Sequence, residues 1–192
     1  MLLAAVAAVA WWVGPLSALF VFLGAFTYAI VYTVWLKRRT WWNIVVGGLS
    51  GSFAALAGSA LAEGTPGGMA ISLALILFLW TPPHFWSLAI AGREDYRAAG
   101  IPMLPVVVGD LRAAHVILQS TVLLVAASFL PLGYGAGAWY AAGAVLGGAW
   151  FLRQAWRLTR LPDRRRAIHC FLASLAHLCL LFAGACLDVL IR

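Results

Sequence analysis

Charged residues are scarce in this sequence. Asp, Glu, Lys and Arg make up only 10% of its 192 residues, against about 25% in soluble domains. Hydrophobic residues reach 64%, and the mean hydropathy is +0.95. A water-soluble fold could not cover so much apolar surface. The composition therefore excludes a soluble enzyme and a disordered chain, and it indicates a polytopic membrane protein.

Cysteine and nucleotide-binding motifs are scarce as well. The three cysteines lie in the last apolar stretch without CxxC or Cys/His spacing, so they predict neither a disulfide scaffold nor a metal site: Cys170, Cys179 and Cys186. The sequence has no GxxxxGK loop, which argues against a nucleotide ligand. The formal net charge of +7 is explained by orientation signals in membrane loops, so no nucleic-acid partner is expected.

Breaks at proline, glycine and charge clusters divide the chain into seven apolar segments. We expect them at 2–13, 16–36, 43–62, 69–91, 112–130, 136–156 and 167–190. Six of them are long enough to span the bilayer, because about 20 residues at ~1.5 Å rise cross a ~30 Å hydrocarbon core. The first is too short, so we expect Met1 to interrupt a spanning helix and the chain to be truncated at its amino end.

The basic residues predict the topology. The joints at 37–42, 92–111 and 157–166, with their flanks, hold twelve of the thirteen Lys and Arg residues, and alternation of the segments puts these joints on one side. Cytoplasmic loops of membrane proteins carry an excess of Lys and Arg. We therefore expect these three joints in the cytoplasm and the carboxyl end of the chain on the opposite side.

The third and fourth segments contain unusual patterns. Small residues recur every four positions in the third, a spacing that lets another helix approach closely: Gly47, Gly51, Ala55 and Ser59. In the fourth, Pro82 and Pro83 interrupt a span and free two backbone carbonyls, which must then be satisfied by neighbours or a cavity. The prolines predict a kinked helix that lines a cavity.

His84 follows the prolines and lies about 12 Å below the basic end of the fourth segment. An ionisable group at this depth normally faces the protein interior or a cavity. A lone histidine is more often a hydrogen-bonded core residue than a ligand, so both roles stay open. If the helix continued through Gly92, the eleven residues from His84 to Asp95 would make three full turns plus about 20°. The two side chains would then lie on one face of the helix.

Two polar clusters could bind a phosphorylated substrate at the basic end. Carboxylates mix with cations in 93–97, and Mg²⁺ prefers one or two carboxylates together with phosphate oxygens. The cations of 37–39 could bind a diphosphate. Plain alternatives remain for both, namely a solvated loop for the first and a membrane anchor for the second.

Three sequence blocks, in this order, resemble the heme O synthase family of protoheme IX farnesyltransferases. The first runs from Tyr32 to Thr40 and continues with Asn43 and Gly47-Gly48. The second is Phe78-Leu79-Trp80-Thr81-Pro82-Pro83-His84-Phe85-Trp86. The third joins Asp95-Tyr96 to the stretch from Ala99 to Gly109.

The resemblance implies an all-α bundle of nine transmembrane helices around a central cavity, typical of intramembrane aromatic prenyltransferases. The seven segments would match its third to ninth helices, so residues 1–192 would be a single prenyltransferase domain lacking its first two helices. It implies transfer of a farnesyl group from farnesyl diphosphate, bound through Mg²⁺, to a vinyl group of protoheme IX, giving heme O. It further implies a multi-pass protein of the cell inner (plasma) membrane, with partners in the heme A pathway or oxidase assembly.

The resemblance also implies residue roles. Asp95 would be the catalytic metal-binding carboxylate, Lys37 and Arg38 diphosphate contacts, and His84 a residue on the heme side of the cavity. Aromatic faces could shield an allylic cation at Tyr32, Trp80 and Trp86. The remaining substrate-binding candidates are Arg39, Asn43, Arg93, Tyr96 and Arg97.

The chain departs from the family pattern in two places. The family's first Asp-rich motif is absent, and Ala54, Ala55 and Ser59 replace two prolines and a tryptophan that are common in the third segment. Two alternative functions fit the same helices. One is a prenyltransferase that acts on a quinone precursor, and the other is a non-catalytic membrane protein that keeps only the helical scaffold.

Overall fold

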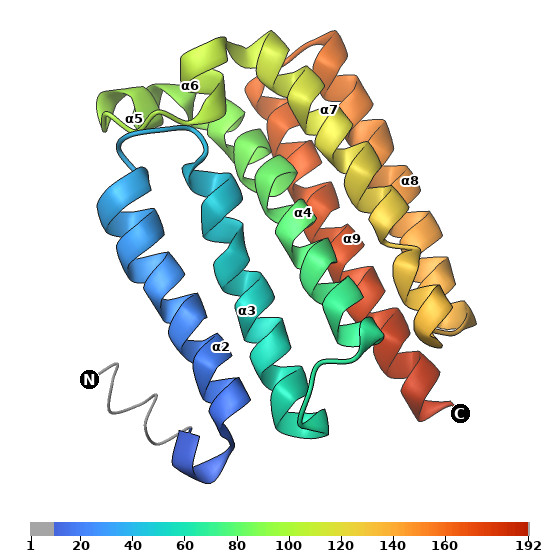
Figure 1. Cartoon of the computed structure of the whole chain (residues 1–192). Coiled ribbons are helices and arrows are strands. Elements are labelled where there is room, and N and C mark those ends of the chain that lie inside the picture. The colour runs from blue at the N-terminus through green and yellow to red at the C-terminus, as the bar shows by residue number, and fades with distance from the viewer. Residues whose placement is uncertain (1–9, 192) are drawn as a thin grey trace.

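The computed structural model describes residues 10–191, and all regular elements in this range are helices (Figure 1). The first expected segment lies mostly outside the described residues. Ten elements follow in chain order: α2 (Pro15–Phe26), the π-helical η1 (Thr27–Leu36), α3 (Asn43–Glu63), α4 (Gly68–Ala91), α5 (Arg93–Ala98), α6 (Leu104–Val108), α7 (Asp110–Ala127), the 3₁₀ turn η2 (Leu130–Tyr134), α8 (Ala138–Arg160) and α9 (Arg164–Leu190).

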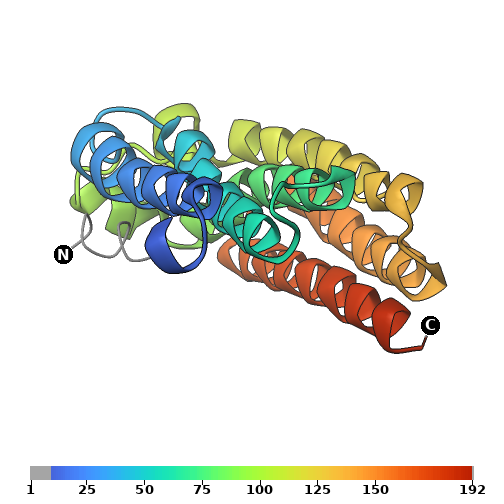
Figure 2. The ribbon, with the colours of Figure 1, turned by 60° about the horizontal axis from the view of Figure 1, so that its bottom comes forward.

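The long helices form one bundle with α4 at its centre. Helix α4 packs against α3 on one side and against α7 and α9 on the other, α2 extends the bundle beyond α3, and α8 packs on α7 and α9. Figure 2 shows α2 and α3 at one side of the bundle and α8 and α9 at the other. The all-α polytopic fold predicted from the sequence is confirmed.

Five helical stretches of the described chain are long and apolar enough to cross a membrane: Pro15–Leu36, Asn43–Glu63, Gly68–Ala91, Asp110–Tyr134 and Arg164–Leu190. They match five of the predicted segments within a few residues. The sixth predicted span is α8, which is long enough but less apolar than the others. It contains Arg153 and Gln154 as well as Gly143, Gly147 and Gly148.

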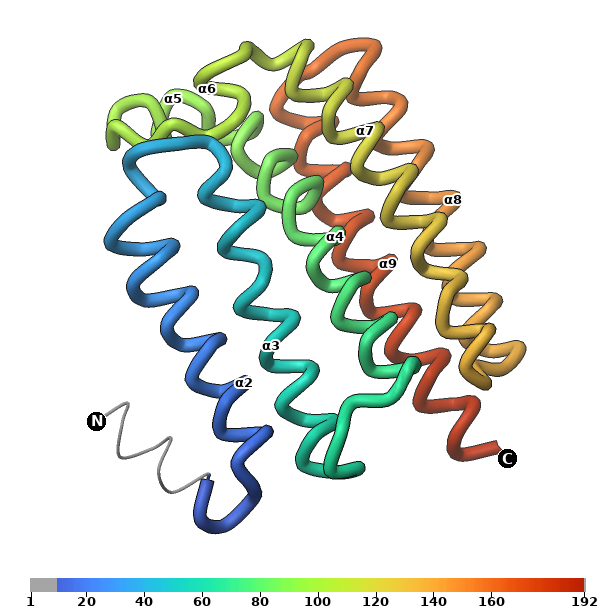
Figure 3. Tube along the Cα trace, in the orientation of Figure 1, coloured from blue at the N-terminus to red at the C-terminus, as the bar shows by residue number. Residues whose placement is uncertain are grey.

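Helix α4 continues through its two prolines. Pro82 and Pro83 are both buried inside a helix that is assigned without a break from Gly68 to Ala91, and Figure 3 traces it as one rod between α3 and α9. The Thr81 hydroxyl donates to the Leu77 carbonyl at 2.9 Å, and the Ser87 hydroxyl to the Pro83 carbonyl at 2.8 Å. Helix α4 also packs on α3, α7 and α9, and this packing holds a helix whose local sequence disfavours it.

The three basic joints lie together. The 37–42 loop, α5 with α6, and the turn between α8 and α9 all gather at one end of the bundle, at the top of Figure 1, and the chain ends at the other. The grouping of the joints predicted from the charge pattern is therefore confirmed. We call this end the basic end.

Candidate substrate cavity and carboxylate site

A cavity of about 340 Å³ opens between η1, α3 and α4, and we call it the α3–α4 cavity. Its walls are mostly apolar, and Lys37 stands at its basic end with Nζ 5.9 Å from the centre of the Tyr32 ring. The lining residues are Tyr28, Tyr32, Lys37, Ile44, Gly47, Gly48, Ser50, Gly51, Thr81 and Phe85. Two of the sequence-predicted site residues, Tyr32 and Lys37, therefore meet in one cavity.

Glycines leave room for the aromatic wall of this cavity. A Cβ on Gly47 would come within 2.8 Å of Cδ2 of Tyr32, and one on Gly48 within 3.0 Å of Cβ of Thr81. A Cβ on Gly51, one turn further along α3, would meet nothing within 4 Å. Two members of the predicted small-residue stripe thus differ in their surroundings, since Gly47 accommodates Tyr32 and Gly51 borders open space.

Asn43 holds the loop that carries Lys37. It is fully buried at the first position of α3, and its Nδ2 donates to the carbonyls of Thr40 at 2.7 Å and Lys37 at 3.3 Å. Arg38 and Arg39 are exposed on the same loop and line none of the cavities described here. The structure therefore places Asn43 behind the loop and only one of the three cations at the cavity.

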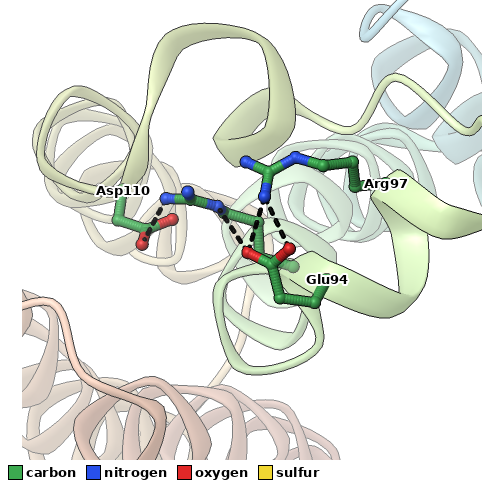
Figure 4. Close-up of polar contacts among 4 residues, drawn as sticks. Glu94, Arg97 and Asp110 are labelled. Atoms are coloured by element: carbon green, nitrogen blue, oxygen red, sulfur yellow. Dashed lines mark hydrogen bonds and ion pairs between the residues drawn. The ribbon is translucent and has the colours of Figure 1, made fainter.

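The acidic residues of α5 divide into paired and unpaired groups. Arg93 forms an ion pair with Asp110 at 2.8 Å, and the Glu94 carboxylate accepts from Arg97 at 2.5 Å (Figure 4). Among the described residues Asp95 has no ion-pair partner. A Cβ added to Gly92 would lie 3.7 Å from Oδ2 of Asp95. Asp95 is thus the free carboxylate of this segment.

Asp95 borders two cavities, of about 490 Å³ and 300 Å³. The larger one lies between α4, α5 and α9 and also contains Tyr96 and Arg164. Burial raises the pKa of the Tyr96 phenol, which therefore stays protonated and able to donate a hydrogen bond at neutral pH. Neither of these cavities contains Lys37.

The condition for an alignment of His84 with Asp95, a helix that continues through Gly92, is not met. Helix α4 ends at Ala91, Gly92 caps it with φ −112°, and α5 starts afresh at Arg93. Glycine stops the helix because it has low helix propensity and the bundle ends there. Asp95 therefore belongs to a separate short helix.

His84 faces α9. Its ring stacks on Trp80 and Phe171 with centroid distances of 4.0 and 4.5 Å, and its Nδ1 lies 2.7 Å from Oγ of Ser174. Trp80 also contacts Ser174, because the Nε1–H group of Trp80 donates to the Ser174 carbonyl at 2.9 Å. Trp86 is buried with its ring 6.0 Å from that of Trp41. Of the three predicted aromatics, only Tyr32 lines a described cavity.

Two residues of the site were not found from the sequence. Asp110 holds Arg93, and Arg164 joins Asp95 in the larger cavity. Both stand far along the chain from α5, in segments where a charge is expected simply because a loop meets water. No local signal separates them from anchor residues. In the described part of the chain no three His, Cys, Asp or Glu side chains gather as a metal cage.

The fold agrees with the comparisons to known proteins. The model of the UbiA prenyltransferase family matches residues 1–181, and the chain belongs to that family. No solved structure matches it.

The similar curated proteins carry a more particular name. Protoheme IX farnesyltransferase 2 of Paramagnetospirillum magneticum is 57% identical over 189 residues, which cover 98% of this chain and 64% of that protein. Protoheme IX farnesyltransferase 1 of the same organism is 53% identical over 89% of this chain and 61% of its own length. The Chloroflexus aurantiacus protoheme IX farnesyltransferase is 44% identical over 92% of this chain and 30% of its own length. The chain spans about three fifths of the length of the two Paramagnetospirillum relatives.

Proposed function

We propose that this chain carries out the farnesyl transfer of heme O synthesis, in which a farnesyl group passes from farnesyl diphosphate to a vinyl group of protoheme IX. The observation that carries the proposal is the 57% identity to a protoheme IX farnesyltransferase across 98% of the chain. Residues 1–192 act in this proposal as one transmembrane domain, because every long helix of the described range packs in a single bundle.

The α3–α4 cavity suits a prenyl diphosphate. Its apolar lining would cover the isoprenoid chain, and Lys37 at its basic end would neutralise part of the diphosphate charge. Tyr28, Tyr32 and Phe85 line the same space, and aromatic rings there would stabilise positive charge on the allylic carbons. Asn43 acts as a positioning residue, since it holds the carbonyl of Lys37.

Asp95 suits a Mg²⁺ ligand. Its carboxylate is unpaired while those of Glu94 and Asp110 are held by arginines, and Mg²⁺ commonly takes one or two carboxylates plus phosphate oxygens and water. When bound, the ion would offset the charge of the leaving diphosphate. Arg164 and Tyr96 line the same cavity, and both could donate to phosphate oxygens.

The reaction would proceed by ionisation and capture. The bond between farnesyl C1 and the diphosphate oxygen breaks, and its electron pair leaves with the diphosphate. The vinyl group forms a carbon–carbon bond to the allylic cation, and water adds to the resulting cation with loss of a proton. Apolar walls around the cation keep water from capturing it first.

His84 enters the proposal as a positioning residue between α4 and α9. Its contacts with Ser174 and Phe171 fix the orientation of α4, on which Thr81 and Phe85 face the cavity.

The proposal also includes the orientation of the protein. It lies in the inner (plasma) membrane of the cell with its basic end in the cytoplasm, because cytoplasmic loops carry an excess of Lys and Arg.

The test is direct production of heme O. Membranes containing the chain receive farnesyl diphosphate, Mg²⁺ and protoheme IX, and extracted hemes are separated by chromatography and identified by mass. The assay is run on the chain alone and on the chain joined to the remaining part of the 57% identical relative. We expect heme O from the joined form. Prenylation of an aromatic quinone precursor instead would favour the first alternative function, and correct insertion without any transfer would favour the non-catalytic one.

A further inference from the structure

The turn between α8 and α9 forms a second polar pocket, of about 490 Å³, which we call the arginine pocket. It receives cations from both helices, namely Arg157 and Arg160 from α8 and Arg165 and Arg166 from α9. Its residues are distinct from those that line the α3–α4 cavity and the two cavities beside Asp95. The arginine pocket therefore has no part in the proposed transfer reaction.

The charge in this pocket is largely uncompensated. Its single acid, Asp163, accepts from the side chain of Arg166 and from the Arg166 backbone N–H at 2.7 Å. Within the described chain Arg157, Arg160 and Arg165 have no ion pair. Three arginines without an ion-pair partner line one pocket and could bind an anion, because guanidinium groups bind phosphate oxygens in a bidentate manner.

The surroundings of the pocket show which anion fits. The ring of Trp156 lies 4.9 Å from the guanidinium carbon of Arg160 and is half exposed, as is typical of aromatic residues at the boundary between membrane and water. Below the pocket, Trp150 and Leu146 lie seven and eleven residues before Arg157 on the same helical face, with 46% and 66% of their surface exposed. An exposed stripe thus runs along α8 from the arginines of the pocket through Arg153 to the apolar side chains of Trp150 and Leu146.

We propose that the arginine pocket binds the phosphate of an anionic membrane phospholipid, with the acyl chains lying along the exposed face of α8. Headgroup charge and acyl chains together match the arginines and the stripe, whereas a free phosphate would use only the first. Basic pockets between helices at a membrane surface are a known way to hold anionic headgroups. The inference is independent of the catalytic proposal, since the residues involved line different cavities.

The test measures lipid binding to the full chain in detergent by native mass spectrometry. Phosphatidylglycerol is titrated against the original chain and against Arg157→Gln, Arg165→Gln and the double variant. We expect each single change to weaken the first phosphatidylglycerol about fivefold and the double change about thirtyfold, since each surface cation contributes roughly 1 kcal/mol to such binding. Arg157→Lys keeps the charge but not the bidentate geometry, so it should lose less affinity than Arg157→Gln, and this comparison separates loss of charge from loss of fold.

The matched control is Arg112→Gln, which removes an exposed arginine of α7 near the basic end that lines none of the described cavities. It should change the affinity less than twofold. Equal weakening by Arg112→Gln and Arg157→Gln would overturn the proposal in favour of general attraction. Equal binding of phosphatidylcholine, or displacement of phosphatidylglycerol by an equal concentration of inorganic phosphate, would overturn it as well, and the latter would identify a soluble-anion site.

Discussion

The carboxylate of Asp188 in α9 accepts the backbone N–H of Gly137 at 2.7 Å, at the point where α8 begins. It also accepts the N–H groups of Trp139 and Tyr140, both at 3.1 Å. The first N–H groups of a helix have no partner within the helix, and a carboxylate there also opposes the positive end of the helix dipole. A buried acid near the end of one helix therefore caps the start of its neighbour.

This contact makes Asp188 a stability residue. We expect Asp188→Ala to lower the free energy of unfolding by about 1–3 kcal/mol, because buried N–H groups lose their acceptor. Gly137→Ala should act in the same direction, since its Cβ would lie 2.5 Å from Oδ1 of Asp188. Thermal unfolding in detergent measures both. Glu63→Gln, an exposed acid at the same end of the bundle, is the control and should leave the midpoint nearly unchanged.

Asp95 and Glu94 give a matched pair for the metal proposal. Asp95→Asn should reduce farnesyl transfer at least a hundredfold while the protein still inserts, because the amide keeps the shape but loses the charge that holds Mg²⁺. Glu94→Gln should have a much smaller effect, since that carboxylate is already held by Arg97. Heme O formation at several Mg²⁺ concentrations is the measurement. Near-normal turnover of Asp95→Asn would remove this residue from the site.

Substitutions of Lys37 and Arg38 compare a cation that lines the α3–α4 cavity with an exposed cation on the same loop. Lys37→Gln should raise the KM for farnesyl diphosphate about tenfold with a smaller change in kcat, because Lys37 lines the α3–α4 cavity. Arg38→Gln should alter KM by less than threefold, since Arg38 is exposed outside it. Steady-state kinetics decides between the two. Equal effects of both changes, or an inverted topology in reporter fusions, would favour the anchor interpretation.

Gly47 and Gly58, two glycines of α3, compare a position in the wall of the α3–α4 cavity with one outside it. Gly47→Ala should impair transfer about tenfold, because its Cβ would force the Tyr32 ring to move. Gly58→Ala adds the same methyl group to α3 outside the described cavities, where nothing lies within 4 Å, so activity should persist and the helix should gain some stability. The pair is compared by heme O yield and by unfolding temperature. An active Gly47→Ala variant would show that the position of Tyr32 is unimportant.

Asp163 predicts a pH effect at the start of α9. The backbone N–H of Arg166 donates to its carboxylate, and this bond, with the Arg166 charge, holds the pKa of Asp163 below its usual range. A lowered pKa means that the stabilisation is present at neutral pH and is lost as the pH falls from about 4 through the folded-state value. Asp163→Asn keeps a capping side chain that does not titrate. The unfolding midpoint of the original chain should therefore decline more steeply below about pH 4 than that of Asp163→Asn.

The bundle was predictable from the sequence, but several side-chain positions were not. Apolar runs and basic joints indicated the spans and their common end because both follow from the physics of the bilayer alone. The start of α3 at Asn43 and the end of α4 near Ala91 agree with the prediction within a residue. Hydropathy carries no information on which face of α4 meets which neighbour, so the contact of His84 with α9 could not be foreseen.

The ion-pair partners could not be predicted from the sequence for a related reason. Asp110 and Arg93 are seventeen residues apart and meet only because α6 turns the chain back over the end of α4. Composition identified 93–97 as a mixed-charge segment but could not show that Glu94 is occupied and Asp95 free. The close approach of α8 to α9 was also not predicted, although Gly143 and Gly147 of α8 stand four residues apart, as the small residues of α3 do.

The contact between α8 and α9 bears on how the chain enters the bilayer. A Cβ on Gly143 would lie 2.5 Å from the Leu180 carbonyl oxygen, and one on Gly184 2.6 Å from that of Trp139, so the two backbones touch. Helix α8 has the lower hydropathy of the two, and its buried Gln154 faces the pocket that α9 helps to form. Gly143 and Gly184 are therefore covered only when α8 and α9 pair as a helical hairpin, so the ribosome must release both helices before these glycines are sheltered from lipid.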